Sequence, residues 1–383
     1  MTNDLERNSL SKIRVLHCIE TISSGGVEKV RLGFAQYLDK EKFELRIICT
    51  NSKGPIKLAL EQEGVRIYDV GAFKSPFEWD KYRIVLSIIR SYKPQIIHGA
   101  VFEGMSMAAV GGFLGRVPIV ILEETSDPQN RSKKAIWLQR QLSKVATKVI
   151  GISPSVVDFL EGKARIPKEK VLLVNNGVPL PLLTDNVECD LLRRELGIEN
   201  GDIVIGSVGR VYDPVKRFSD LLEAIKEIRN PRVKFLLVGQ GPDLEILKSK
   251  ASELGLEGQF IPVGYQENTS PFYSIMDIFS LPSANEGFGL VAAEAMLHYL
   301  PVVATAVGGL KDVVIDNKTG FLVPPFSPPE IGKKLQLLID NPKLRIQMGR
   351  AGYERAVANY TSERYCQQIE KLYNNLLESN LEK

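Results

Sequence analysis

Residues that bind transition metals or form disulfides are scarce in this sequence. The 383 residues include only three histidines and four cysteines. The cysteines lie far apart and form no C-x-x-C pair, which argues against a zinc site or a disulfide framework and predicts reduced thiols in a cytosolic protein. The histidines, His17, His98 and His298, provide little material for a histidine-based metal site.

Signals for membrane insertion or export are also absent. No apolar stretch reaches the roughly 18 residues that a membrane-spanning helix needs. The N-terminal segment MTNDLERNSLSK is polar and contains acidic residues, so it does not resemble a signal peptide. The net charge of +3 is too small to indicate nucleic-acid binding, but it permits weak attraction to an anionic membrane. We therefore expect a cytoplasmic protein with no nucleic-acid partner, and peripheral contact with the inner face of the plasma membrane stays open.

Apolar, β-branched segments alternate regularly with helical patterns along the chain. This alternation is typical of a parallel sheet covered by helices on both faces. The predicted strands form two series, which a proline-rich stretch at residues 178–185 separates. The first series comprises residues 13–19, 43–50, 65–70, 95–100 and 117–122, and the second comprises residues 202–209, 233–239, 259–264, 278–283, 301–306 and 320–325.

These patterns predict an α/β protein with two Rossmann-like domains that face each other across a cleft. Residues 1–178 are expected to form the first domain and residues 179–360 the second. The polar segment 361–383 is expected to be a helix that can pack back on the first domain. Ligands of open α/β sheets bind outside the carboxyl ends of the strands, so functional residues are expected there.

The segment SANEGFGLVAAEA, residues 283–295, follows one predicted strand of the second series. Its glycines permit a turn, and the next residues favour a helix, whose free N–H groups and positive dipole end attract an anion. Glu286 and Glu294 flank this helix start. Upstream, Arg210 and Lys216 follow another strand of the same series and can converge on a phosphate.

The distance between the two glutamates limits what they can do together. Eight helical steps of about 1.5 Å separate them by roughly 12 Å, whereas the two carboxyl groups of a glycosidase lie about 5–9.5 Å apart. The spacing therefore disfavours the acid/base pair of a hydrolase. It suits a nucleotide-sugar, with one carboxylate on sugar hydroxyls, the other on the ribose diol, and the diphosphate at the helix start between them.

The E-x7-E pattern from Glu286 to Glu294, followed by PVVATAVGG, resembles the retaining family-4 glycosyltransferases, which have the GT-B fold. Several independent motifs are more specific than one glycine-rich loop. Here they follow the family order over nearly the whole chain: GGVEKV at 25–30, VLLVNNGVP at 171–179, VGR-x5-K at 208–216, VGQGP at 238–242 and VGY at 263–265.

The resemblance implies a role for each matching position. Glu286 is expected to bind hydroxyls of the donor sugar, and Glu294 those of the ribose. Arg210 and Lys216 are expected to neutralise the diphosphate and, with Glu286, to form the catalytic group. Phe288, Gly289 and Leu290 are expected to offer backbone N–H groups to the donor. Gly25 and Gly26 are expected to let the backbone of the first domain come close to it, and Tyr265 is expected to contact the base.

Two places in the first half of the chain, and the residues around Tyr299 before PVVA in the second half, depart from the family pattern. Many members carry H-x-H at the end of the strand that here contains His98, and Ala100 replaces the second histidine. His98 is expected either to orient the donor sugar in the cleft as a further catalytic residue or to be a structural residue. The next loop often contains a histidine in relatives, whereas Glu123 and Glu124 stand there in this chain. They are expected either to shape the acceptor site or to be solvated loop charges.

The resemblance implies a hexosyltransferase that retains the anomeric configuration, and the lack of a D-x-D motif predicts transfer without a metal; no cofactor is expected. No D-x-D occurs in the sequence, the carboxylate pair with which the other main glycosyltransferase fold holds a metal. The expected donor is a nucleotide-diphosphate sugar, most commonly a UDP-sugar such as UDP-glucose. The expected acceptor is a saccharide or lipid-linked glycan in the synthesis of cell-envelope or extracellular polysaccharide.

Three other functions remain compatible with these observations. They are a nucleotide-sugar 2-epimerase of the same fold, a non-catalytic sugar-binding protein, and a partner-dependent or degenerate transferase, the last because of Ala100.

The segment 131–148 is basic, contains no acidic residue and has interleaved apolar residues. Such a helix either lies on an anionic membrane or packs on the first domain with a solvated basic face.

Overall fold

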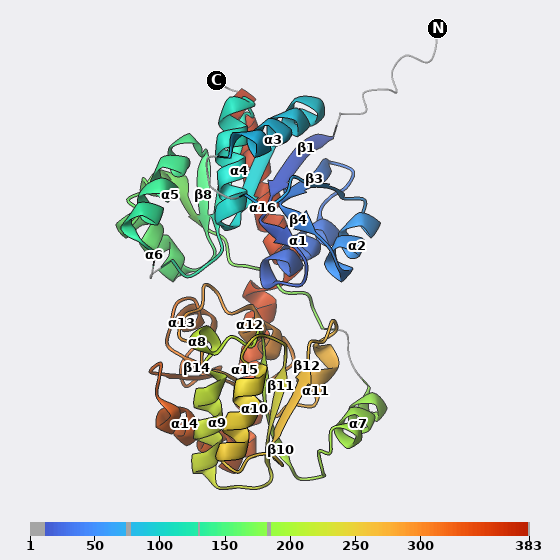
Figure 1. Ribbon diagram of the computed structural model, residues 1–383, viewed down its shortest axis with the longest axis vertical. Coiled ribbons are helices and arrows are strands. Elements are labelled where there is room, and N and C mark those ends of the chain that lie inside the picture. The colour runs from blue at the N-terminus through green and yellow to red at the C-terminus, as the bar shows by residue number, and fades with distance from the viewer. Residues whose placement is uncertain (1–11, 74–77, 129–130, 182–184, 382–383) are drawn as a thin grey trace.

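A computed structural model describes residues 12–73, 78–128, 131–181 and 185–381 of the chain. The molecule has two lobes, and each is built around a parallel β-sheet flanked by helices (Figure 1). This architecture confirms the predicted α/β class with two Rossmann-like units.

The first sheet has seven parallel strands in the order β5-β3-β1-β6-β7-β8-β9. Both of its faces are covered, which explains the nearly continuous apolar sequences of its strands. A separate small sheet pairs β2 (Thr21–Ile22) with β4 (Asn51–Ser52). The seven strands are β1 (Ile13–Cys18), β3 (Phe43–Cys49), β5 (Arg66–Asp69), β6 (Ile96–Ala100), β7 (Ile119–Glu124), β8 (Lys148–Gly151) and β9 (Val171–Leu173).

Successive residues of these strands enter two different cores, because side chains alternate between the faces of a sheet. Leu16 and Ile97 belong to one core, which includes residues of α3 (Trp79–Tyr92), α4 (Val101–Leu114) and α6 (Pro154–Gly162). Val15 and Ile96 belong to the other, with residues of α1 (Gly26–Tyr37), α2 (Pro55–Gln62) and α16 (Ser362–Leu381). Helix α5 (Lys133–Val145) packs beside α4, and the short 3-10 helix η1 (Lys168–Lys170) precedes β9.

The second sheet has six parallel strands in the order β12-β11-β10-β13-β14-β15. They are β10 (Ile203–Val208), β11 (Val233–Val238), β12 (Phe260–Gly264), β13 (Ile278–Leu281), β14 (Val302–Thr305) and β15 (Gly320–Val323). The helices of this lobe are α7 (Asn186–Glu195), α8 (Asp213–Lys216), α9 (Phe218–Ile228), α10 (Leu244–Glu253), α11 (Ser270–Ser274), α12 (Leu290–Leu297), α13 (Leu310–Val313), α14 (Pro328–Asp340) and α15 (Pro342–Asn359).

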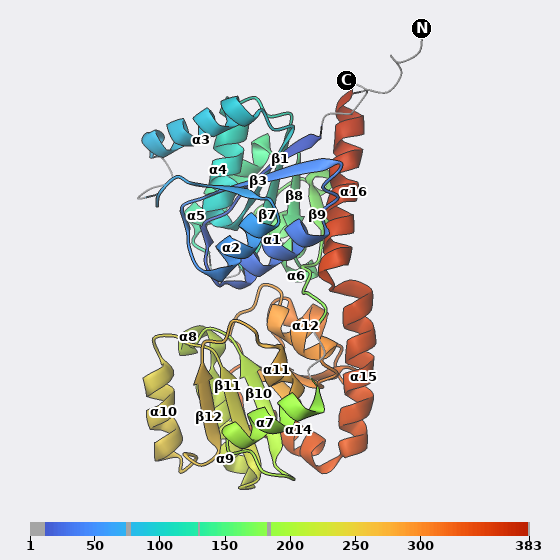
Figure 2. The ribbon, with the colours of Figure 1, turned by 90° about the vertical axis from the view of Figure 1, so that its right-hand side faces the viewer.

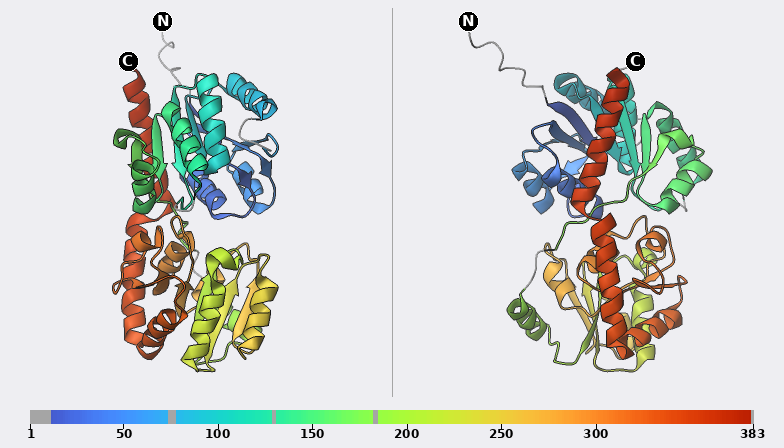
Figure 3. Two further views of the ribbon diagram at one scale, coloured as in Figure 1. Left: turned by 60° about the vertical axis from the view of Figure 1, so that its left-hand side comes forward. Right: turned by 180° about the vertical axis from the view of Figure 1, so that it is seen from behind.

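The last two helices run along one side of both lobes (Figure 2). Helix α15 packs against α12 and α14 in the second lobe, and α16 then returns to the first lobe and packs against α1. The back view shows both helices end to end across the two sheets (Figure 3). At the junction, Thr361 pairs with Val178 in an isolated β-bridge. The chain therefore crosses between the lobes twice at neighbouring points.

One strand continues further than its sequence predicts. The expected strand at 117–122 is β7, and it includes Glu123 and Glu124 as its last two residues. Both carboxylates consequently belong to the sheet, and their side chains point to opposite faces of it.

None of the helices in the described ranges combines the length and the apolar character needed to cross a membrane.

Candidate active site

A cleft of about 1120 Å³ lies between the two lobes. Its walls include loops that leave the carboxyl ends of β1, β10, β11, β12 and β13, where ligands of such sheets are expected. The predicted donor-site positions all line this cleft: Gly25 and Gly26 from the first lobe, and Arg210, Lys216, Tyr265, Glu286, Phe288, Gly289, Leu290 and Glu294 from the second.

Lys216 and Glu286 form an ion pair at the wall of the cleft. Lys216 is the last residue of α8, and Glu286 lies in the loop between β13 and α12. The Nζ–Oε2 distance is 2.7 Å, and each side chain is 18% exposed. Ser283 also lies 3.4 Å from Glu286 Oε2. The pair combines a cation for a phosphate with a carboxylate for a hydroxyl, and Arg210 adds an exposed second cation on the same wall.

The start of α12 presents backbone N–H groups to the same cleft. The first turn of a helix leaves these groups without partners, so it favours an anion. Gly289 precedes the helix with φ of +99°, a left-handed conformation that a side chain would disfavour. Phe288 is 2% exposed and packs against Tyr360, which fixes the loop in front of the helix. The site thus offers a turn whose geometry suits an anion, beside the ion pair.

Glu294, one turn into α12, is held by Tyr273. The Tyr273 hydroxyl donates to Glu294 Oε2 over 2.8 Å, and burial together with this carboxylate raises the pKa of Tyr273, so the phenol keeps its proton. His298 stacks on the Tyr273 ring and contacts the Ser270 hydroxyl and the Glu294 carbonyl, each at 2.8 Å. This cluster orients the Glu294 carboxylate within the lining of the cleft.

The glycines of the first lobe allow close packing at the start of α1. A Cβ atom on Gly26 would lie 2.7 Å from the Leu290 side chain of the opposite lobe, and one on Gly25 would overlap the Glu28 carboxylate. Glu28 is buried and accepts a hydrogen bond from Thr21. A larger residue at Gly25 would displace the Glu28 side chain, and one at Gly26 would displace the Leu290 side chain.

His98 lies away from the cleft, which corrects its assignment as a catalytic residue. It is 1% exposed and faces α16, where its Nδ1 lies 2.8 Å from the Tyr373 hydroxyl. The same hydroxyl lies 2.9 Å from His17 Nε2. The structural interpretation of His98 is the one that the geometry supports, because β6 directs this side chain into the core that α16 covers.

Glu123 belongs to the same buried cluster, so it is neither an acceptor ligand nor a solvated charge. It is 0% exposed and pairs with Arg31, and its Oε2 lies 3.0 Å from His98 Nε2. Tyr365 of α16 donates to it over 3.2 Å. The charge of Glu123 is therefore neutralised by Arg31 of α1, and α16 covers it with the Tyr365 hydroxyl.

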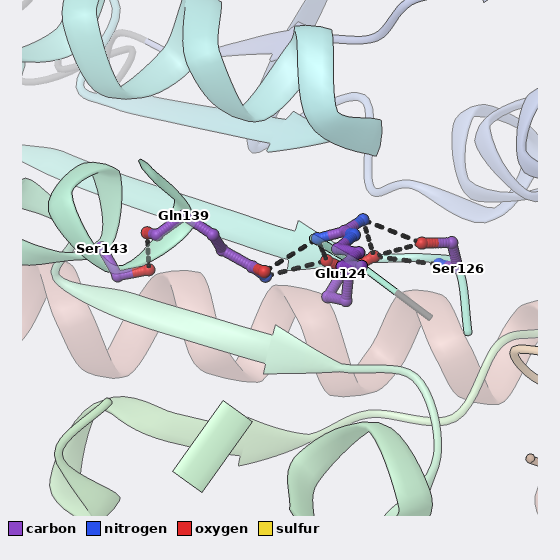
Figure 4. A network of polar contacts seen from close by, with 5 residues as sticks. Glu124, Ser126, Gln139 and Ser143 are labelled. Carbon is purple, nitrogen blue, oxygen red and sulfur yellow. Dashed lines mark hydrogen bonds and ion pairs between the residues drawn. The ribbon is translucent and has the colours of Figure 1, made fainter. Parts of the chain in front are cut away.

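Glu124 points to the other face of the sheet and is also fully buried. Arg131 Nη2 donates to its Oε1 over 3.0 Å, Gln139 Nε2 donates to its Oε2 over 2.8 Å, and Ser126 donates to Oε1 over 2.7 Å (Figure 4). These bonds fasten α5 and the loop after β7 to the sheet. The expectation that Glu124 contacts the acceptor, or is solvated, is wrong for the same reason as for Glu123.

The buried cluster predicts a loss of stability in acid. Burial alone would raise the pKa of Glu123, but the Arg31 guanidinium lowers it to about 2, and burial lowers the pKa values of His17 and His98. The contribution of these three groups to the free energy of unfolding is therefore fully present above pH 6.5. As the pH falls, the contribution of the histidines is lost first, because they bind protons in the unfolded chain but not in the folded one. Glu123 adds a further loss of about 3 kcal/mol between its unfolded pKa of 4.5 and pH 2.

Urea unfolding at a series of pH values measures this effect. Glu123→Gln is expected to be less stable than the parent at pH 7, because Arg31 loses its partner, and to show a weaker decline below pH 4.5. Glu253→Gln on exposed α10 serves as the control and should keep the parent profile. An unchanged decline below pH 4.5 in Glu123→Gln would contradict the assignment.

Other residues at the site were not apparent from the sequence. Tyr273 of α11 contacts the donor-site residue Glu294, and Ser153 of the first lobe contacts Gly287, the neighbour of Glu286. The pattern S-P-S before an apolar helical segment could have predicted Ser153 as a helix cap. No local sequence pattern, however, shows which residue of the second lobe its hydroxyl contacts. Thr125 and Asn176 also line the cleft from the first lobe.

Comparisons with known proteins agree with this geometry. The family model described as "Glycosyltransferase Family 4" matches residues 24–181, and the one described as "Glycosyl transferases group 1" matches residues 189–355. The capsular polysaccharide biosynthesis glycosyltransferase CapM of Staphylococcus aureus is 24% identical over 363 residues, which span 91% of this chain and 94% of that protein.

A second relative is the D-inositol 3-phosphate glycosyltransferase of Corynebacterium urealyticum. It is 31% identical over 263 residues, which span 65% of this chain and 61% of that protein, so less than two thirds of that relative is matched. Among solved structures, Anabaena HepE in complex with UDP superimposes with a TM-score of 0.84 at 22% identity, over 95% of this chain and 100% of that chain. The two models cover both lobes in order, and the chain belongs to the family-4 glycosyltransferases of the GT-B fold.

Proposed function

We propose that the protein transfers a hexose from a nucleoside-diphosphate sugar, with UDP-glucose as the first donor to test, to a saccharide or lipid-linked glycan. The observation that carries the proposal is the Lys216–Glu286 pair beside the start of α12 in the interdomain cleft. The structure of HepE contains UDP, and CapM is named for capsular polysaccharide biosynthesis, which supports a UDP-sugar and a role in cell-envelope or extracellular polysaccharide.

In this proposal each group of the cleft holds one part of the donor. Glu286 accepts hydrogen bonds from sugar hydroxyls, and Glu294, oriented by Tyr273, accepts them from the ribose. Lys216, Arg210 and the N–H groups at the start of α12 stabilise the charge that develops on the departing diphosphate. Tyr265, which is 47% exposed beside the cleft, contacts the base.

The transfer is proposed to retain the anomeric configuration. The acceptor hydroxyl attacks C1 from the face that the diphosphate leaves, the C1–O bond to the diphosphate breaks, and a donor phosphate oxygen takes the hydroxyl proton. This route needs no side-chain nucleophile and no metal, because cationic side chains and a helix dipole act on the leaving group. Turnover should persist in excess chelator, and its abolition by chelator with recovery on adding Mg²⁺ or Mn²⁺ would disprove metal independence.

A donor screen followed by product analysis tests the function. Nucleotide-sugars are first ranked by thermal shift, because a ligand at a hundredfold excess over Kd adds about 2.7 kcal/mol to stability. The best donor is then incubated with saccharide and lipid-linked acceptors, and the new linkage is assigned by NMR. An α-linked product from an α-linked donor supports the proposal. Conversion of the donor sugar without acceptor would indicate an epimerase, and binding without turnover of any donor would indicate a binding protein.

Tyr273→Phe is expected to raise the donor KM about fivefold and leave kcat nearly unchanged. The variant keeps the ring that stacks on His298 but loses the hydroxyl that orients Glu294, and one such hydrogen bond contributes about 1 kcal/mol. Initial-rate kinetics with varied donor measure the change. A fall in kcat at unchanged KM would show that Glu294 does not act as a ribose ligand.

We also propose that the outer face of α5 contacts an anionic membrane near the acceptor. Trp137 is 59% exposed on this helix. Exposed basic residues surround it, namely Lys133, Lys134, Arg140 and Lys144, and α5 contains no acidic residue. An aromatic side chain among cations suits an interface of anionic headgroups.

Vesicle sedimentation tests this contact. The parent should bind vesicles that contain phosphatidylglycerol, and binding should weaken with added salt. The double variant Lys133→Glu/Lys144→Glu should bind at least about tenfold more weakly, since each cation near such a surface contributes about 1 kcal/mol. Lys226→Glu/Lys343→Glu, with the same charge change on the second lobe, is the control. Equal binding by both variants, or binding independent of anionic lipid, would refute the proposal.

A further inference from the structure

The loop between β13 and α12, residues 282–289, is held at three of its backbone carbonyls. Thr305 donates to the carbonyl of Ser283 over 2.5 Å, and the Gly309 N–H donates to that of Glu286 over 2.9 Å. Both of these donors belong to the second lobe. The third carbonyl, of Gly287, accepts a 3.0 Å hydrogen bond from the hydroxyl of Ser153, which belongs to the first lobe. The loop that carries Glu286 is therefore fixed in part by the opposite domain.

The groups around Ser153 direct the proton of its hydroxyl toward Gly287. It is 0% exposed and forms the N-cap of α6, where its oxygen accepts from the Val156 N–H over 3.4 Å. The Ser155 hydroxyl lies 3.0 Å away and can supply a second donor. A hydroxyl has a single proton, and with two donors directed at its oxygen that proton is free for Gly287.

The packing around Gly287 shows that the two lobes touch here without intervening space. A Cβ atom on Gly287 would lie 2.9 Å from the backbone carbonyl carbon of Ser126 and 3.1 Å from the Asp127 nitrogen, both in the loop after β7. A glycine at this position therefore permits the first lobe to reach the carbonyl. The contact depends on the present arrangement of the lobes, because a shift of about 1 Å would break the hydrogen bond.

The orientation of the Gly287 carbonyl has a direct effect on the anion-binding turn. The carbonyl of Gly287 and the N–H of Phe288 belong to one planar trans peptide, so fixing one fixes the direction of the other. Phe288 N–H is the first of the backbone donors in front of α12. We infer that Ser153 is a positioning residue: through Gly287 it sets the donor-binding turn only when the two domains are closed on each other. This inference rests on the proposed function for its catalytic consequence, but its structural part does not.

Ser153→Ala tests the inference against a matched helix-cap control. Ser132 caps α5 in the same way, accepting from the Ala135 N–H over 3.2 Å, in an exposed position of the first lobe. Ser132→Ala removes a cap of the same kind and leaves the contact between the lobes in place. Ser153→Thr keeps the hydroxyl and serves as the conservative rescue.

Two readouts separate positioning from simple destabilisation. In hydrogen exchange, the peptide covering residues 282–291 should exchange about fivefold faster in Ser153→Ala than in the parent, and at the parent rate in Ser132→Ala and Ser153→Thr. With the donor identified by the screen, kcat should fall about three- to tenfold in Ser153→Ala alone.

Unchanged exchange at residues 282–291 in Ser153→Ala, or equal acceleration in Ser132→Ala, would overturn the inference. Faster exchange with parental kcat would also overturn it, because the turn would then be loosened without consequence for the reaction. If the parent itself turns over no nucleotide-sugar, the proposed function fails, and the exchange experiment still decides whether Ser153 holds the loop.

Discussion

Lys216→Ala is expected to lower kcat by about 10²–10³-fold. Lys216 is the cation closest to Glu286, and a preorganised charge that meets the developing negative charge of a leaving group has an effect of this size. The side chain is only 18% exposed, so solvent cannot replace it as it replaces a surface lysine. Quenched-flow or steady-state assays at saturating donor measure the change, with UDP release followed directly.

Two further variants make the result specific. Lys216→Arg keeps the charge but changes its geometry and is expected to recover part of the rate. Lys226→Ala, on the exposed side of α9, removes a lysine of the same lobe outside the cleft and should retain parental kcat. Near-normal turnover of Lys216→Ala would remove this residue from the mechanism.

Glu286→Gln is expected to lower kcat/KM by about a hundredfold. The amide keeps the size of the carboxylate but loses its charge, so it binds sugar hydroxyls and Lys216 more weakly, and a small misplacement of the reacting carbon is sufficient for a loss of this size. Glu294→Gln provides the comparison, because a ribose ligand should affect mainly the donor KM. A parental kcat/KM for Glu286→Gln would show that the donor sugar is held elsewhere.

The double variant Lys216→Ala/Glu286→Gln should lose less than the product of the two single effects. The two residues contact each other and are assigned to one donor molecule, and residues that act as a unit are not additive. Full additivity in this cycle would indicate that the 2.7 Å ion pair has no part in the reaction.

The sequence predicted the features that depend on order along the chain. Alternating apolar segments indicated two parallel sheets, and the glycines before a helix indicated the turn at Gly289. The predicted cleft residues also meet because strands of one sheet end at one edge, so that Glu286 after β13 lies near Arg210 and Lys216 after β10.

The predictions that failed depend on which face of a strand is covered, and by what. His98 lies near the end of a strand, as a cleft residue would, but its partner Tyr373 is 275 residues further along the chain. Glu123 and Glu124 look like loop charges until Arg31 on α1 and Arg131 before α5 are placed beside them. Buried ion pairs between distant elements leave no local periodicity by which they can be recognised.

The return of α16 to the first lobe has a consequence for the order in which the protein folds during synthesis. Domains generally fold from the N-terminus as they leave the ribosome. Here Tyr365 and Tyr373, which contact the charged and imidazole groups beneath the first sheet, are made only after the whole second sheet. Until then Glu123, His98 and His17 lack the contacts that α16 provides and are covered only in part, by α1. The first lobe therefore stays incomplete while the second lobe, which is made later, can finish folding before it.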